Sequence, residues 1–104
     1  MHCTSSIDNI SIDTELESDI ANIAKAFSHP ARVRIIRILS QLNGCMTSDL
    51  VNELNLAQST VSEHLRILRQ AKLVIAQVQA PKTCYRINAE QLQRFYQQLE
   101  YTQI

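Results

Sequence analysis

Glycine is nearly absent from this chain of 104 residues, which contains one glycine, Gly44, and two prolines. Glycine-rich phosphate-binding loops need several glycines, because their backbone must approach the phosphates closely. The composition therefore excludes both the P-loop and the dinucleotide-binding loop. It also disfavours an all-β fold, which uses many tight turns.

Long apolar runs are absent as well. No run approaches the roughly 20 apolar residues that cross a bilayer, and residues 1–12 lack the basic start and apolar middle of a signal peptide. Apolar residues make up 45% of the chain and charged residues 19%, which favours one globular domain. No catalytic constellation is recognisable. We therefore expect a non-enzymatic protein that works in the cytoplasm, without membrane contact.

The formal net charge is zero, but the charges are unevenly distributed. Residues 1–27 carry a net charge of −4 and residues 89–104 a net charge of −1. Between them, residues 28–88 carry eight basic residues against three acidic ones, a net charge of +5. A basic middle segment is typical of a protein with an anionic partner, but solvated faces of ordinary helices would give the same distribution.

Apolar spacings of three and four predict five helices, over residues 14–28, 30–42, 48–54, 58–71 and 89–101. A short strand at 45–46 and a hairpin of strands at 73–79 and 83–87 complete the pattern. The expected caps are a Thr14–Glu17 capping box, a left-handed Gly44 and Asn88 with Gln91. Residues 1–12 read as a loose arm and residues 13–102 as a single domain. This order predicts a mainly helical winged helix-turn-helix.

The helix predicted at 58–71 has the side chains that a DNA-binding helix needs. Short polar residues at its start can contact base edges or phosphates, and basic residues further along would meet phosphates. A polar helix start is also an ordinary capping pattern, but its combination with a helix pair and a basic hairpin favours DNA binding. These candidate residues are Gln58, Ser59, Thr60, Ser62, Arg66, Arg69 and Lys72.

Two segments, SHPARVRII at 28–36 and LAQSTVSEHLRIL at 56–68, resemble the ArsR/SmtB family of bacterial repressors. The resemblance covers about residues 14–100. It implies a homodimer formed by the helices at about 14–28 and 89–101. It also implies binding to a palindromic operator, with the helix at about 58–71 in the major groove and the wing at about 73–87 on the backbone. An inducer then releases the DNA. Carried over by position, the contacts fall on Gln58, Ser59, Thr60, Ser62 and His64, with Lys82 and Arg86 on the wing; Arg32 aligns with an arginine of the family.

The resemblance does not extend to the residues with which members of the family sense an inducer. Metal-sensing members carry a Cys-x-Cys where this chain has Met46 and Ser48, and the segment 89–104 has no His, Asp or Cys for a zinc site. Three cysteines remain, namely Cys3, Cys45 and Cys84.

If the strand at 45–46 pairs with the returning strand, Cys45 and Cys84 come close together. They could then bind a thiophilic ion such as As(III), with Cys3 as third ligand, or oxidise to a disulfide. They could equally pack as small apolar residues. In that case the protein is a constitutive winged-helix regulator or a protein-interaction module with purely structural cysteines.

Overall fold

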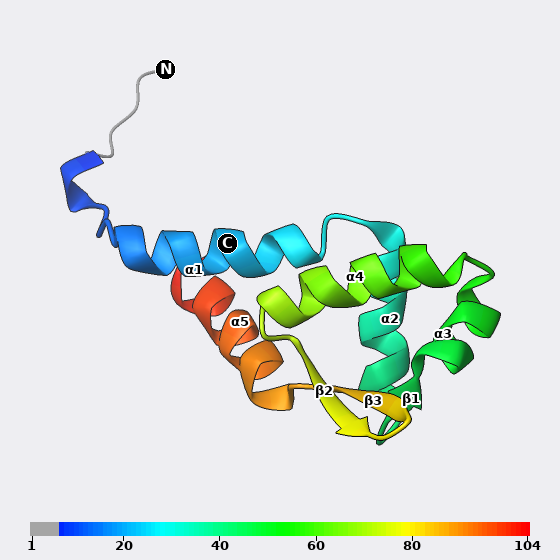
Figure 1. Cartoon of the computed structure of the whole chain (residues 1–104). Coiled ribbons are helices and arrows are strands. Elements are labelled where there is room, and N and C mark those ends of the chain that lie inside the picture. The colour runs from blue at the N-terminus through cyan, green and yellow to red at the C-terminus, as the bar shows by residue number, and fades with distance from the viewer. Residues whose placement is uncertain (1–6) are drawn as a thin grey trace.

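The computed structural model describes residues 7–104, with only the backbone described at Cys45 and Met46. A short 3-10 turn at Ile7–Asn9 is followed by eight elements, the helices and strands of Figure 1. They are α1 (Thr14–Ala26), α2 (Pro30–Gln41), β1 (Cys45–Met46), α3 (Thr47–Leu54), α4 (Gln58–Gln70), β2 (Val74–Gln79), β3 (Lys82–Ile87) and α5 (Ala89–Tyr101). The predicted winged helix-turn-helix order is confirmed. The predicted arm lies partly outside the described residues, and Cys3 lies wholly outside them.

The capping residues differ in part from those predicted. Asp13, not Thr14, caps α1: it has an extended backbone, and its Oδ1 accepts a hydrogen bond from the Leu16 amide at 3.0 Å. Thr14 is already helical, so the predicted capping box was wrong by one residue. Asn88 caps α5 as predicted, because its Oδ1 accepts from the Gln91 amide at 3.3 Å.

Gly44 does not act as the predicted left-handed cap. No glycine within residues 7–104 has a positive φ, and α2 ends at an extended Leu42 (φ −122°, ψ 153°). Gly44 is instead required by a close approach, because a Cβ at this position would lie 2.6 Å from Sγ of Cys84. The glycine therefore lets β3 pack tightly against the chain that leads into β1.

The three strands form one antiparallel sheet in the order β1-β3-β2. The strands β2 and β3 form the wing, and β1 ties its base to the start of α3. Along β3, Tyr85 and Ile87 pack against the core, whereas Lys82 and Arg86 are exposed. Because successive strand residues alternate between faces, Lys82, Cys84 and Arg86 share the other face.

One core joins all five helices to the base of the wing. Its fully buried side chains come mainly from α2, α3 and α4, while Ile23 and Ala26 extend it to α1 and Phe95 to α5. Phe27, directly after α1, stacks on Phe95 with ring centroids 5.4 Å apart. In Figure 1, the first half of α1 projects beyond this core at the end of the molecule opposite α3. Within residues 7–104, no helix has the length and apolar character needed to cross a membrane.

Candidate nucleic-acid interface

Helix α4 has one buried face and one exposed polar face. Val61, His64, Leu65 and Leu68 are buried at helical spacing, which fixes the rotation of α4 against the core. The opposite side is available to a partner along about 15 Å from Ser59 to Arg69, at about 1.5 Å per residue. Its exposed residues are Gln58, Ser59, Thr60, Ser62, Glu63, Arg66, Arg69 and Gln70.

The start of α4 lacks the side-chain cap that closes the starts of α1, α2 and α5. Asp13, His29 and Asn88 cap α1, α2 and α5 with side-chain hydrogen bonds, but Ala57 at the start of α4 offers none. The first amides of α4 therefore have no side-chain cap and lie beside the hydroxyls of Ser59 and Thr60. Such a helix start favours contact with an anion or a hydrogen-bond acceptor.

The far end of α4 is basic and adjoins the wing. Arg66, Arg69 and Lys72 line a hollow of about 570 Å³ that also contacts β2 at Ile75. The strand register places Arg86 directly opposite Ile75, so this wing residue belongs to the same basic area. The structure thus brings together basic residues that lie up to 20 positions apart in the sequence.

Glu63 is an exposed residue of this surface that the sequence analysis did not select. Its carboxylate accepts hydrogen bonds from Arg66, including one from Nε at 2.9 Å. These hydrogen bonds lower the pKa of Glu63, and the acid in turn raises the pKa of Arg66. The signal was present in the sequence, because Ser59, Glu63 and Arg66 follow the spacing of one helix face.

His64 does not lie where the resemblance placed it. Its side chain is 7% exposed, and it faces the core with Val61 and Leu68 rather than the exposed side of α4. The predicted DNA contact of His64 has no exposed side chain to make it, so we leave His64 out of the proposed contacts. Arg32 is also buried, at 8% exposure, and donates a hydrogen bond to the His64 ring.

The predicted thiol pair is only partly described. The predicted pairing of β1 with β3 is confirmed, but the register sets Cys45 opposite Tyr85 and Met46 opposite Cys84. Opposed residues share a face of the sheet, so the register position of Cys45 belongs to the face of Tyr85, whereas Cys84 lies on the other face. The register therefore does not set the two cysteines as a pair. The side chain of Cys45 and all of Cys3 lie outside the described residues. Among the residues that are described, no group of three His, Cys, Asp or Glu side chains could hold a metal ion.

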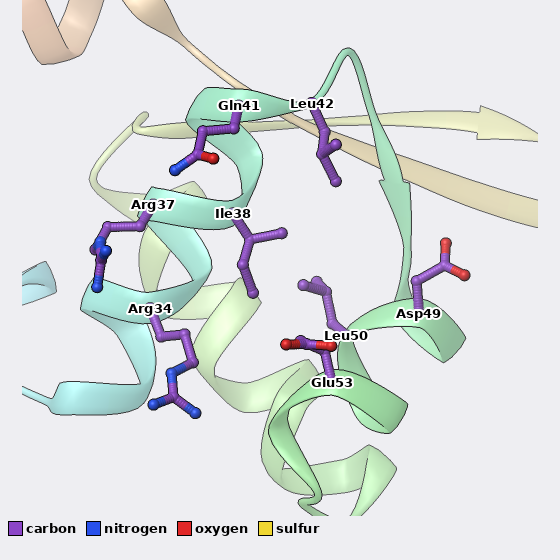
Figure 2. Close-up of a pocket in the computed structure, with 8 residues that line it drawn as sticks. All are labelled: Arg34, Arg37, Ile38, Gln41, Leu42, Asp49, Leu50 and Glu53. Atoms are coloured by element: carbon purple, nitrogen blue, oxygen red, sulfur yellow. The ribbon is translucent and has the colours of Figure 1, made fainter.

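A second hollow, of about 440 Å³, lies between α2 and α3. Figure 2 shows its basic side chains, Arg34 and Arg37, on α2 and its acidic side chains, Asp49 and Glu53, on α3. Opposite charges in one hollow give no preference for an anion. None of the predicted DNA-binding residues lines it, so we place the candidate interface on α4 and the wing.

Known proteins share both the sequence and the fold of this chain. Residues 29–76 match the model of a bacterial regulatory protein family, the arsR family. An uncharacterized HTH-type transcriptional regulator of Methanocaldococcus jannaschii is 34% identical over 67 residues, which is 64% of this chain and 75% of that protein. The transcriptional repressor SdpR of Bacillus subtilis is 33% identical over 73 residues, covering 69% of this chain and 79% of the repressor.

An arsenical resistance operon repressor of Staphylococcus xylosus is 31% identical over 84 residues, 79% of this chain and 78% of that protein. Among solved structures, an ArsR-like transcriptional regulator from Rhodococcus sp. RHA1 superposes with a TM-score of 0.76 at 22% identity. That match covers 84% of this chain and 81% of the other, and it shows a common fold. Since several relatives exceed 30% identity over more than two thirds of their length, the chain belongs to the ArsR family of transcriptional regulators.

Proposed function

We propose that the protein is a homodimeric repressor that binds a palindromic DNA operator through the exposed face of α4. The observation that carries this proposal is the division of α4 into an apolar buried face and a polar exposed face. Short polar side chains and uncapped amides at the start of α4 suit base edges and phosphates in the major groove. The basic far end then suits the phosphate backbone.

The wing supplies the second part of the proposed DNA-binding surface. Lys82 lies at the tip of the hairpin and Arg86 near its base, and both are exposed on the same face of β3. The proposed contacts are Gln58, Ser59, Thr60, Ser62, Arg66 and Arg69 on α4, with Lys82 and Arg86 on the wing.

The proposed dimer forms at the other end of the molecule, through α1 and α5. Nine large apolar side chains are exposed in the described part of the chain, and six of them lie before α1 or on and after α5. A second copy of the chain would cover this concentration of apolar surface. These six are Ile7, Ile10, Ile12, Tyr96, Tyr101 and Ile104.

A groove of about 750 Å³ runs between the start of α1 and the end of α5. It is lined by apolar residues of the preceding segment and of both helices, including Ile10, Leu16, Ile20 and Tyr101. The proposed dimer would place the two α4 helices in one assembly, so that a palindromic site with half-sites about one helical turn apart becomes readable.

The proposal is tested by selecting duplexes from a random pool with the purified protein and then measuring affinity for the selected duplex. We expect a palindromic consensus and a complex that contains two chains. Gln58→Glu should weaken binding at least about tenfold, since a carboxylate at a contact position faces acceptors and phosphates. Gln41→Glu, the same change at an exposed position at the end of α2, is the matched control.

A pool in which no sequence is enriched would contradict DNA recognition by α4. Equal losses of affinity for Gln58→Glu and Gln41→Glu would contradict it as well. A structured consensus without two-fold symmetry would contradict the dimer while leaving DNA binding intact.

We also propose that a thiol-directed signal releases the DNA, on the ground that Cys84 lies in the middle of β3, where this strand pairs with both β1 and β2. A shift of this strand would move Lys82 and Arg86 with it. The test is the DNA affinity of the reduced protein, of the oxidised protein and of the protein with arsenite. Cys84→Ser and Cys45→Ser are measured beside it. Unchanged affinity in all three conditions would indicate a constitutive regulator.

A further inference from the structure

A buried guanidinium connects the end of α1 to α4. Nε of Arg32 donates to the Ala26 carbonyl at 3.0 Å, and Nη2 donates to the Lys25 carbonyl at 3.3 Å and to Oγ of Ser28 at 3.0 Å. The remaining nitrogen, Nη1, lies 3.1 Å from Nδ1 of His64. One side chain of α2 thus holds the last turn of α1 and the buried face of α4 together.

The chemistry of this contact fixes the proton on His64. A guanidinium can only donate hydrogen bonds, so Nδ1 of His64 must accept, which leaves the ring neutral with its proton on Nε2. Burial lowers the pKa of His64, and the neighbouring His29 and Arg32 lower it further, whereas Glu63 opposes them. A protonated ring would have no acceptor for Arg32 and would place two cations in contact.

We propose that the Arg32–His64 hydrogen bond positions α4 for DNA, and that a proton on His64 breaks it and releases the DNA. This inference rests on the proposed DNA-binding function of α4. His64 lies among the residues that fix the rotation of α4, so a shift of its ring moves the exposed face that carries Ser59, Ser62 and Arg66. Arg32 and His64 are positioning residues, since neither is exposed for contact with DNA.

The sign of the pH effect follows from the lowered pKa. At neutral pH, His64 is neutral and the contact is complete. Below the ordinary histidine pKa of about 6.5, His64 takes up a proton more readily in the unfolded or displaced protein than in the folded protein. Stability and DNA affinity therefore fall with falling pH. This direction is opposite to that of ordinary DNA binding, which gains from added positive charge.

His29 is a second imidazole ring beside His64, and its effect on binding must be distinguished from that of His64. It is exposed, its ring centroid lies 4.5 Å from that of His64, and its Nδ1 accepts from the Ala31 amide at 3.0 Å. Protonation of His29 would remove this cap from α2. An Asn at either position keeps an acceptor at the same number of bonds from the backbone but cannot be protonated.

The experiment measures affinity for the selected duplex between about pH 7.5 and pH 5.5 for the wild type, His64→Asn and His29→Asn. We expect the wild type to lose affinity with a limiting slope of about tenfold per pH unit for each His64, which is about a hundredfold per pH unit for a dimer. We expect His64→Asn to keep in acid the affinity that it has at neutral pH. His29→Asn should retain the loss.

Arg32→Lys provides an independent variant, because lysine keeps the positive charge but lacks the planar fork of donors. Its affinity at neutral pH should already be as low as that of the wild type in acid, with little further pH dependence. Wild-type affinity for Arg32→Lys, or an equal acid loss in His64→Asn and the wild type, would overturn the proposal.

Urea unfolding of the same variants at both pH values distinguishes this inference from the proposed function. If the wild type binds no duplex at pH 7.5, the proposed function fails. The positioning contact then still predicts that acid destabilises the wild type more than His64→Asn. Equal destabilisation of the two proteins would overturn the contact as well.

Discussion

The two ends of the molecule expose opposite kinds of side chain. The end formed by the segment before α1 and by α5 exposes isoleucines and tyrosines, and the residues before α2 carry a net negative charge. The side formed by α4 and the wing exposes mainly short polar and basic residues, with Ile75 and Val78 as apolar exceptions on β2. The zero net charge of the chain is therefore an average over two surfaces that suit different partners, a second copy and an anionic polymer.

The same contrast appears in how the helices begin. Helices α1, α2 and α5 are closed by the side chains of Asp13, His29 and Asn88, whereas α4 begins at Ala57 without such a bond. A capping side chain stabilises a helix by about 0.5–2 kcal/mol. The helix proposed to enter DNA lacks this stabilisation at the end that would meet the partner.

The largest expected effect comes from a cavity in the core that both ends of the molecule share. Leu65 is 1% exposed in the centre of the buried face of α4. Leu65→Ala should lower the free energy of unfolding by about 2–5 kcal/mol, because it leaves a cavity among packed side chains. The neighbouring Arg66→Ala is exposed and should change it by about 0.5 kcal/mol or less. Urea unfolding measures both. Similar values for the two variants would contradict the assignment of the faces of α4.

The next prediction tests whether the apolar end, and not the wing, forms the dimer. Tyr101→Asp puts a charge on an apolar residue that is 77% exposed at the end of α5. It should weaken the dimer at least about tenfold, since a buried aromatic contributes about 1.5–3 kcal/mol. Val78→Asp makes the same kind of change at a 75% exposed residue of the wing and should leave the dimer intact. Sedimentation equilibrium measures both, and a dimer unaffected by Tyr101→Asp would argue against this interface.

A smaller effect concerns the attachment of the wing alone. Gly44→Ala should destabilise the protein by about 1–3 kcal/mol, because its Cβ would overlap Sγ of Cys84, 2.6 Å away. In a Cys84→Ala background, the same change should cost much less. Thermal unfolding of the four proteins gives the coupling. Additive effects would show that the glycine is needed for another reason.

Much of this fold was predictable because its signals are local. Apolar spacing located all five helices, and β-branched residues located the wing. The burial of His64 was predictable too, since Val61, His64, Leu65 and Leu68 follow one helical stripe, but the resemblance assigned it to DNA instead. The role of Gly44 was not predictable, because it depends on Cys84, which is 40 residues away and meets it only through the pairing of β1 with β3.

The candidate site was predicted less completely than the fold. The polar start of α4 follows from the sequence, but the meeting of Arg66, Arg69 and Lys72 with the wing depends on how β2 leaves α4. The contact between Arg32 and His64 joins residues 32 positions apart and depends on how α2 crosses α4. Neither arrangement is encoded in a local pattern.

The salt dependence of DNA affinity tests the central claim most directly, namely that the exposed face of α4 binds the phosphate backbone. Arg69→Gln removes a charge from this face, and Arg37→Gln removes the same charge from α2, at the hollow of Figure 2. The slope of log affinity against log salt changes by about 0.9 for each phosphate that the protein no longer neutralises. The account predicts a shallower slope, by about 2 per dimer, for Arg69→Gln and the wild-type slope for Arg37→Gln. Equal slopes for the two variants would contradict it.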